Sequence, residues 1–256
     1  MPLPRLRLAA EPLAGLPEVE PGDDLAALIA GAAESAVTGL RGGEVLVVAQ
    51  KVVSKAEGRL LRLADVEPGD RARELASHTG KDPRLVQAIL DESTEVLRVG
   101  REVLIVRTRH GLVCANAGLD QSNVPEGLVC LLPDDPDASA RRIRAGLDER
   151  LAAAPAVLVS DSFGRAWRLG QLDVAIGCAG LQPLHDRRGE RDAQGRELTA
   201  TVDAVADAAT AAASLVRHKA GAEAVVVVHG LERYVTPEDG PGAAAIVRAL
   251  AEDLFR

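Results

Sequence analysis

The sequence predicts an α+β protein in which mixed and antiparallel sheets pack against helices. Apolar, β-branched runs such as residues 44–53 and 224–228 are typical of buried strands. Segments with helical spacing of apolar residues, such as 83–93, lie between them. Residues 95–115 change to short alternating segments separated by turn residues, a pattern typical of antiparallel hairpins. An all-parallel, doubly wound sheet is therefore disfavoured.

The N-terminal half predicts one short strand, one buried strand and three helices. Pro21-Gly22-Asp23-Asp24 supplies turn residues and an N-cap acid, so a helix is expected to begin at Leu25. The run EVLVVAQKVV contains mainly apolar residues without a helical period, which predicts a buried strand over its whole length. The expected elements are a strand near 6–9, a helix from 25, a strand over 44–53, and helices over 71–79 and 83–93.

The C-terminal half predicts hairpin strands followed by alternating helices and strands. The segments VLR, EVLIVRT and LVCA form the expected hairpins, and Asp135-Pro136-Asp137 is expected to cap the next helix. The charged segment 186–195 is expected to be a mobile loop, because its charged and turn residues cannot contribute to a core. The remaining elements are a helix over 138–152, a strand over 155–160 that ends at Asp161, a helix over 204–216, a strand over 224–228 and an amphipathic helix over 242–255.

Composition excludes several classes of function. The chain of 256 residues carries 30 Lys and Arg against 38 Asp and Glu, a formal net charge of −8, which disfavours nucleic-acid binding and polybasic membrane binding. The N-terminus has no continuous apolar segment typical of a signal peptide, and no apolar run approaches the ~18 residues of a spanning helix. Three separated cysteines suit a reducing compartment and are expected to be small buried side chains. We therefore expect a cytoplasmic protein.

The first polar cluster with candidate chemistry consists of Gln50, Lys51, Ser54 and Lys55. A lysine at the end of a buried strand can bind phosphate as a compact positive charge. The alternative is an exposed strand edge protected by lysines, and the residues alone support both interpretations equally.

Two further clusters contain an aspartate beside polar residues. Asp120, within residues 116–123, offers hard oxygen ligands suited to magnesium or manganese, although an Asx turn also explains the segment. Asp161 begins a segment with Ser162, Arg165 and Arg168, which combines a metal-type carboxylate with guanidinium groups that can neutralise phosphate. Its alternative is a helix cap with Trp167 packed beside it.

A fourth charged cluster, residues 191–197, is more typical of a solvated loop. The sequence contains neither G-x-x-x-x-G-K-[ST] nor G-x-G-x-x-G after a strand, so any phosphate site must be unconventional. The five histidines show no metal-ligand spacing, and there is no G-x-S-x-G elbow. Zinc hydrolases and serine hydrolases are therefore poorly supported.

Six segments occur in this order: GLPEVEPGDDL, EVLVVAQKVVSKAEGR, ANAGLDQSNVPEG, LLPDDPDASARRIRAGL, SDSFGRAWRLGQLDVAIGCAGL and RDAQGREL. Taken together, they resemble the coenzyme F420-0:L-glutamate ligase (gamma-glutamyl ligase) family. The resemblance extends from Gly15 to about Gly230. The chain resembles the ligase half of the two-domain actinobacterial proteins. Its length leaves no room for their nitroreductase-like half, so none is expected.

The resemblance implies GTP-dependent amide formation with magnesium or manganese, and a monovalent cation such as potassium is a further candidate. It implies one domain over residues 1–256, built as two interleaved subdomains with boundaries near 80–95 and 185–200, and a homodimer. The implied substrates are a deazaflavin coenzyme precursor, L-glutamate and GTP. Asp120 and Asp161 match the ligands of one metal, and Ser162 matches a threonine that serves a second metal. The matched GTP contacts are Leu16, Pro17, Glu18, Val19, Lys55 and Asn123, with Gln50 at a position where Ser or Thr is usual.

Departures from the family pattern keep two alternatives open. Gln50, Gln194, Ala208 and His229 replace residues that are frequent in the family, and Lys219 lies about where archaeal members carry an acidic metal ligand. One alternative is a paralogous ligase that joins a different acid and amine with the same GTP and metal chemistry. The other is a non-catalytic relative, which the retained Asp120, Asp161 and Lys55 disfavour. The leading hypothesis is that the metal bridges GTP phosphates while Lys55 and Arg165 neutralise charge.

Overall fold

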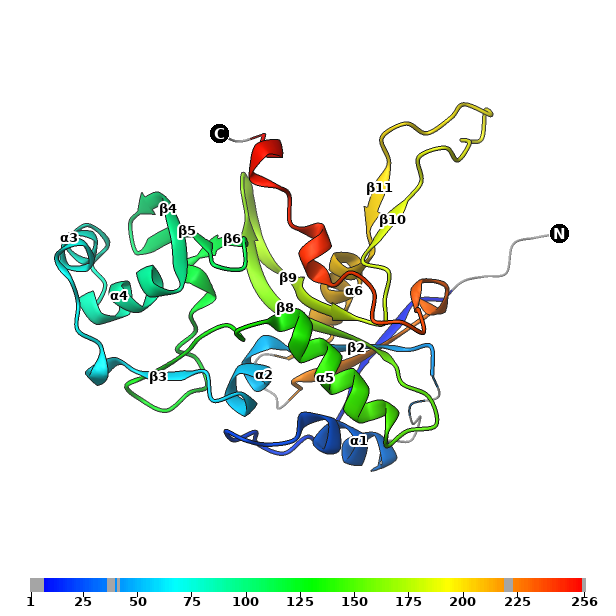
Figure 1. Cartoon of the computed structure of the whole chain (residues 1–256), viewed down its shortest axis with the longest axis horizontal. Coiled ribbons are helices and arrows are strands. Elements are labelled where there is room, and N and C mark those ends of the chain that lie inside the picture. Colours follow the sequence, from blue (N-terminus) through cyan, green and yellow to red (C-terminus); the bar gives the residue numbers. More distant parts are fainter. Residues whose placement is uncertain (1–6, 36–39, 41, 219–222, 255–256) are drawn as a thin grey trace.

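A five-stranded mixed sheet forms the centre of the molecule (Figure 1). The computed structural model describes residues 7–35, 40, 42–218 and 223–254. Strands β2 and β8 are parallel, and all other neighbours in the sheet are antiparallel. The predicted α+β class with mixed and antiparallel sheets is therefore confirmed. In spatial order the strands are β1 (Ala9–Pro12), β12 (Val225–His229), β2 (Val45–Ala49), β8 (Ala156–Arg165) and β9 (Arg168–Ala179).

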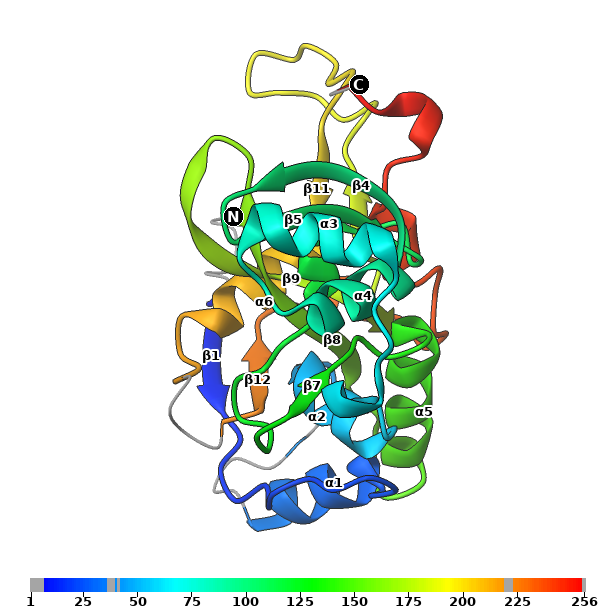
Figure 2. The ribbon, with the colours of Figure 1, turned by 90° about the vertical axis from the view of Figure 1, so that its left-hand side faces the viewer.

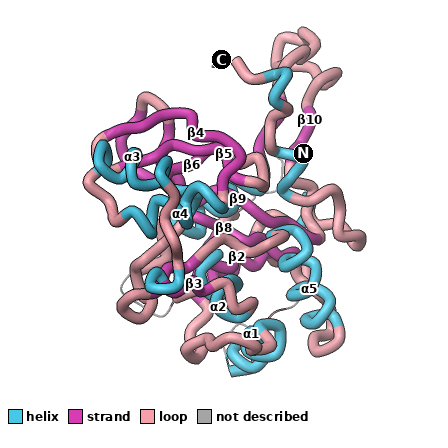
Figure 3. Tube along the Cα trace, turned by 60° about the vertical axis from the view of Figure 1, so that its left-hand side comes forward, coloured by secondary structure: helices cyan, strands magenta, loops and turns pink. Residues whose placement is uncertain are grey.

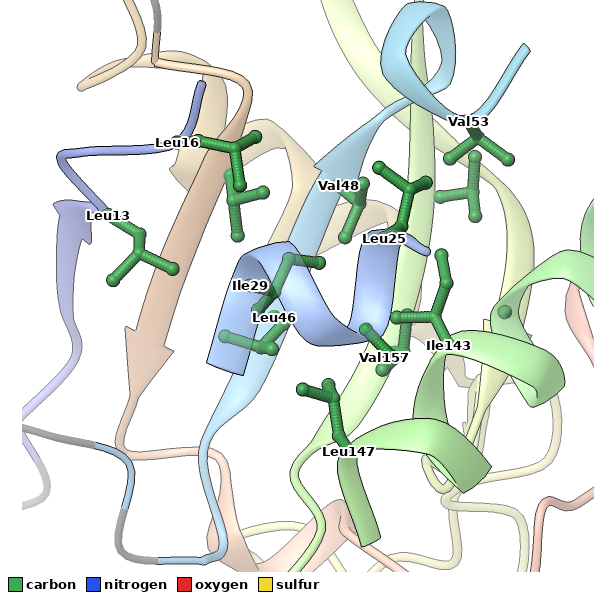
Figure 4. Close-up of a cluster of buried hydrophobic side chains, with 14 of the residues drawn as sticks. Leu13, Leu16, Leu25, Ile29, Leu46, Val48, Val53, Ile143, Leu147 and Val157 are labelled. Carbon is green, nitrogen blue, oxygen red and sulfur yellow. The ribbon is translucent and has the colours of Figure 1, made fainter. Parts of the chain in front are cut away.

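Helices cover both faces of this sheet, because its central strands are apolar on both sides. Leu46 and Val48 of β2 pack beneath helices α1 (Leu25–Ser35) and α5 (Pro136–Asp148) (Figure 4). The alternate residues, Val45 and Val47, face helix α6 (Val205–Ser214) on the other side. This double burial explains why the strands appear in the sequence as continuous apolar runs.

A second, smaller layer lies to the left in Figure 1 and faces the viewer in Figure 2. Its helices and strands enclose a separate apolar cluster that includes Ile89 and Leu104. The antiparallel hairpins predicted for this region are confirmed, as are both helices. The predicted division into two interleaved subdomains stays a prediction. The elements are α3 (Asp70–Thr79), α4 (Pro83–Asp91), β4 (Ser93–Gly100), β5 (Val103–Thr108) and β6 (Val113–Ala115).

Two short strand pairs complete the molecule. Strand β3 (Leu60–Arg62) pairs with β7 (Leu128–Cys130) between the two layers. Strand β10 (Leu184–Asp186) pairs with β11 (Val202–Ala204) at the base of an arm that projects from the body (Figures 1 and 3). The predicted loop 186–195 forms part of this arm.

Both predicted N-caps are confirmed. The Asp24 carboxylate accepts a hydrogen bond from the backbone N–H of Ala27 at 3.0 Å, and the Asp135 carboxylate accepts one from Ala138 at 2.9 Å. The three cysteines are buried and free, as expected. Burial raises the pKa of the Cys114 and Cys178 thiols to about 12, so both are neutral at physiological pH.

The predicted strand over 44–53 is wrong in its second half. Strand β2 ends at Ala49, and helix α2 (Gln50–Ala56) begins at the next residue. The Gln50 side chain donates a hydrogen bond to Ser54 Oγ one turn later, and Val53 packs into the main core from the helix. Tertiary burial therefore overrides the strand preference of the β-branched residues.

Three other predicted elements also differ from the structure. Strand β8 does not end at Asp161 but continues to Arg165, because β9 pairs with its whole length as a long hairpin. Residues 242–254 form two short 3₁₀ turns instead of an amphipathic helix, and Ala243 and Ile246 pack against the apolar cluster on the α6 side of the sheet. The strand predicted near 6–9 overlaps β1 only at Ala9, because β1 begins there and continues to Pro12, and residues 1–6 lie outside the described part of the chain. No helix among the described residues is both long enough and apolar enough to span a membrane.

Candidate functional site

The candidate site forms where the first turn of α2 meets the segment after β6 and the middle of β8. Lys51 Nζ lies 2.8 Å from Asp120 Oδ2. The same ammonium donates to the carbonyl oxygen and the hydroxyl of Ser122, each at 2.8 Å. Backbone hydrogen bonds in both directions join Asp120 to Cys130 at the end of β7. Asp120 is thus held both through its side chain and through its main chain.

Asp161 lies within β8 and is close enough to this group to interact with it electrostatically. Burial raises the pKa of its carboxyl to about 7, and the negative charges of Asp173 and Asp120 act in the same direction. The N–H of Ser162, which donates to Asp161 Oδ1 at 2.9 Å, and the charge of Lys51 oppose the shift. Asp161 therefore sits where a negative charge is under-compensated.

Asp120 behaves in the opposite way although it is also partly desolvated. Burial acts to raise its pKa, but the hydrogen bonds from Lys51 and Ser122 outweigh burial and lower the pKa below its ordinary value. Asp120 is consequently ionised at neutral pH. The carboxylates of Asp120 and Asp161 share the ammonium of Lys51. Their negative charge is therefore only partly compensated, and an additional cation would be stabilised there.

The donor set at Asp120 and Asp161 fits a divalent cation. Hard carboxylate oxygens are the ligands that magnesium and manganese prefer, and a cation would compensate the desolvated charge of Asp161. Within the described ranges, no group of three or more His, Cys, Asp or Glu side chains is placed to hold a metal. A cation at these two carboxylates would complete its coordination with water or substrate oxygens, as magnesium commonly does.

The second lysine of α2 binds the segment before α1. Lys55 forms an ion pair with Glu18, and its side chain is largely buried while that of Glu18 is exposed. Leu16 and Val19 are buried in the main core, whereas Pro17 is exposed. The structure therefore brings residues 16–19 and Lys55 together, as the sequence resemblance implies. Lys51 and Lys55 are four residues apart, so both lie on one side of α2.

Gln50 and Asn123 occupy contrasting positions beside this group. The Gln50 side chain is buried and donates to Ser54 Oγ at 2.7 Å and to the carbonyl oxygen of Leu131 at 2.9 Å, which ties α2 to the segment after β7. Asn123 is exposed and has a positive φ of 56°. It follows Ser122 directly, so it belongs to the same loop as the Lys51 contact.

Ser162 and Arg165 lie further from the Asp120 carboxylate. The Ser162 hydroxyl donates to Asp173 Oδ1 at 2.7 Å, and adjacent side chains on a strand point to opposite faces, so it is directed away from the Asp161 side. Arg165 lies at the turn between β8 and β9, four residues and about 13 Å along the strand from Asp161. Its guanidinium donates to the carbonyl oxygen of Leu169 at 3.4 Å.

Sequence reasoning missed the partners that organise the site. The sequence indicated Lys51 as a polar candidate, but the strand predicted over 44–53 gave no reason to pair it with Lys55. On helix α2 the four-residue spacing places both lysines on one side. The buried ion pair of Asp173 and Arg217 was also not recognised from the sequence. Asp173 lies on β9, which was not predicted, and Arg217 lies after the end of α6. Lys219 lies outside the described residues.

Comparison with known proteins matches most of the chain to a described family. Residues 15–230 match the family described as F420-0:Gamma-glutamyl ligase. A protein of Methanopyrus kandleri is 46% identical over 256 residues, which cover 99% of each chain. A protein of Methanothermobacter thermautotrophicus is 46% identical over 94% of this chain and 96% of its own. A protein of Archaeoglobus fulgidus is 42% identical over 98% of this chain and 97% of its own. All three are named coenzyme F420:L-glutamate ligase.

Proposed function

The chain belongs to the F420-0:gamma-glutamyl ligase family and is a ligase that forms carbon–nitrogen bonds, and from this premise we propose that it adds L-glutamate to coenzyme F420-0. The proposed reaction uses GTP with magnesium or manganese and releases GDP and phosphate. The observation that carries the proposal is the meeting of Lys51, Asp120 and Asp161, which come from three distant segments.

Each part of the site has a role in this reaction. Asp120 and Asp161 would hold the cation, which supplies charge compensation for the triphosphate when it is bound. Lys51 and Lys55 bind phosphate oxygens as compact positive charges on one side of α2. Residues 16–19 and Asn123 contact the rest of the nucleotide. We assign charge neutralisation to the two lysines instead of Arg165, because Arg165 lies at the far end of the β8–β9 hairpin.

The chemistry proceeds by activation of a carboxylate. The acceptor's carboxylate oxygen attacks the γ-phosphorus of GTP, the bond to the β-phosphate oxygen breaks, and an acyl phosphate and GDP result. The amine of glutamate then attacks the acyl carbon, phosphate leaves, and the amine loses a proton to give the amide. Positioning and electrostatic stabilisation provide most of the rate enhancement for such transfers.

Mass spectrometry of the reaction products tests the proposal. The reaction contains the purified protein, GTP, manganese, L-glutamate and the deazaflavin coenzyme without its glutamate tail. A GTP-dependent gain of one or more glutamyl units in the wild type, absent in Asp120→Asn and Asp161→Asn, would support it. Normal turnover in both variants would rule out this assignment of the two carboxylates.

The same assay distinguishes the remaining alternatives. Binding of GTP and manganese without a glutamyl gain would favour a related ligase that joins a different acid and amine, and a panel of substrates with GDP release as the signal would identify it. Failure to bind GTP with manganese would favour a non-catalytic relative. We further propose a homodimer in the cytoplasm and a stimulating monovalent cation such as potassium, which sedimentation and a comparison of potassium with sodium in the assay would test.

A further inference from the structure

A buried ion pair lies behind Asp161, on the α6 side of the central sheet. Arg217 Nη1 is 2.6 Å from Asp173 Oδ2, and the two side chains are only 12% and 8% exposed. Arg217 Nε is also buried, and it has no hydrogen-bond partner among the described residues. Buried ion pairs are often no more stable than well-packed apolar residues, and an unsatisfied buried donor is costly. Stability alone therefore does not account for this pair.

The ion pair holds both chain neighbours of Asp161. The hydroxyl of Ser160 donates to Asp173 Oδ2 at 3.2 Å and accepts from Arg217 Nη1 at 3.0 Å. The hydroxyl of Ser162 donates to Asp173 Oδ1 at 2.7 Å. The N–H of Ser162 in turn donates to the Asp161 carboxylate. A continuous set of hydrogen bonds thus runs from Arg217 through Asp173 and Ser162 to Asp161.

The strand is irregular at this point and needs such support. Val159 pairs with Gly177 but Ser160 pairs with Ala175, so the register shifts between these two residues, directly before Asp161. Shifts of this kind bend a strand and redirect its side chains. Arg217 Nη2 also donates to the carbonyl oxygen of Val47 at 2.9 Å, so Arg217 joins β2 to the irregular part of β8.

We propose that Asp173 and Arg217 are positioning residues that fix the orientation of the Asp161 carboxylate for cation binding. The inference rests on the proposed function, in which Asp161 holds a divalent cation. In the described contacts, neither residue of the pair bonds directly to Asp120 or Asp161. They act through Ser160 and Ser162, in the way that hydrogen-bonded partners orient the ligands of metal sites.

The direction in which Arg217→Met changes Mn²⁺ binding distinguishes a positioning role from an effect of charge alone. Arg217→Met removes a positive charge near the site, so electrostatics alone would leave Mn²⁺ binding unchanged or strengthen it. If Arg217 positions Asp161, the same variant weakens Mn²⁺ binding by about tenfold or more. Asp173→Asn is expected to weaken binding to a similar extent. Ser160→Ala, which loses only one linking hydroxyl, is expected to have a smaller effect in the same direction.

Asp137→Asn provides a matched control. The Asp137 carboxylate is also buried and accepts backbone hydrogen bonds from Cys178 of β9 and from Ala243, but it has no link to Asp161 in the described contacts. This variant is expected to lower Tm without changing the Kd for Mn²⁺. If Arg217→Met does not fold, Arg217→Lys replaces it. This variant keeps the positive charge but loses the planar guanidinium and its several hydrogen bonds.

The experiment measures Mn²⁺ binding to the full chain, without nucleotide, by the electron paramagnetic resonance signal of free Mn²⁺. Crystal structures of the wild type and Asp173→Asn then compare the Asp161 carboxylate, which is expected to rotate or lose its bond to the Ser162 N–H. The inference is overturned if folded Arg217→Met binds Mn²⁺ as tightly as the wild type, or if Asp161 is unmoved in Asp173→Asn. If the wild type binds no Mn²⁺ alone or after GTP is added, the cation assignment of the proposed function fails, while the orientation of Asp161 in the two crystal structures still decides whether the pair positions this carboxylate.

Discussion

The ammonium of Lys51 lies 2.8 Å from the carboxylate of Asp120 and binds the carbonyl oxygen of Ser122 at the same distance. These contacts join the first turn of α2 to the loop that follows β6. They place a positive charge between the central sheet and the smaller layer, beside the desolvated Asp161. Lys51 is therefore the residue on which the electrostatic balance of the candidate site depends most directly.

Lys51→Met is expected to reduce kcat for glutamate ligation on the order of 100-fold, because it removes a charged group that stabilises phosphate in the reaction. The loss of stability should be small, about 1 kcal/mol or less, since the ion pair with Asp120 is partly exposed. Steady-state kinetics and chemical denaturation measure the two effects. Lys81→Met, in the connection between α3 and α4, controls for the loss of one lysine charge. An unchanged kcat in Lys51→Met would exclude this role.

Lys55→Met is expected to raise KM for GTP about tenfold, which corresponds to about 1.4 kcal/mol of lost binding. The reason is that Lys55 is largely buried beside residues 16–19, where the proposed nucleotide lies. A titration of GTP at saturating glutamate and acceptor measures KM, and Lys81→Met again serves as the control. A KM equal to that of the wild type would place the triphosphate away from the second turn of α2.

The sequence predicts three strands of the central sheet and most of the helices, because their signals are local. The predicted strands for β2, β8 and β12 each begin within one residue of the observed strand, and the capping aspartates of α1 and α5 lie where predicted. Helix α2 was not predicted, since Val52 and Val53 favour a strand and the contacts that stabilise the helix come from residues distant in sequence. One of these is the hydrogen bond of Gln50 to Leu131, 81 residues further along the chain.

The candidate site was predicted only in part for the same reason. Asp120, Asp161 and Lys55 stand beside local turn or strand signals, so their chemistry could be suspected from the sequence. The roles of Asp173 and Arg217 depend on β9 folding back along β8 and on the end of α6 reaching β2. Pairings of this kind are fixed by tertiary packing and leave no short-range pattern.

Asp207→Asn is expected to stabilise the protein increasingly as the pH rises. Burial in the first turn of α6 raises the pKa of Asp207, and the N–H of Ala175, which donates to its carboxylate at 3.0 Å, opposes this only in part. Between the ordinary pKa of 3.8 and the raised folded-state pKa, the unfolded chain releases this proton first, so stability falls with rising pH. The asparagine oxygen can still accept the Ala175 bond but carries no charge.

Denaturation of the wild type and Asp207→Asn at several pH values from about 3.5 to 7 measures this effect. The difference in unfolding free energy should shift in favour of the variant across this range and then become constant. Asp65→Asn, at an exposed position, reports the effect of removing one surface charge under the same conditions. A difference that does not depend on pH, or that favours the wild type more at pH 7, would contradict the assigned direction.

Gly177→Ala is expected to destabilise the fold by about 3 kcal/mol, because a Cβ there would lie 2.2 Å from the carbonyl oxygen of Pro136. Helix α5 cannot simply withdraw, since the Asp137 carboxylate in its first turn binds the N–H of Cys178 at 2.8 Å. Gly164→Ala is the matched control on the neighbouring strand β8, where an added Cβ meets no atom within 4 Å, and its cost should stay within about 0.5 kcal/mol. Chemical denaturation compares the two variants. Equal losses would mean that α5 and β9 are not in the close contact that shields one face of the sheet.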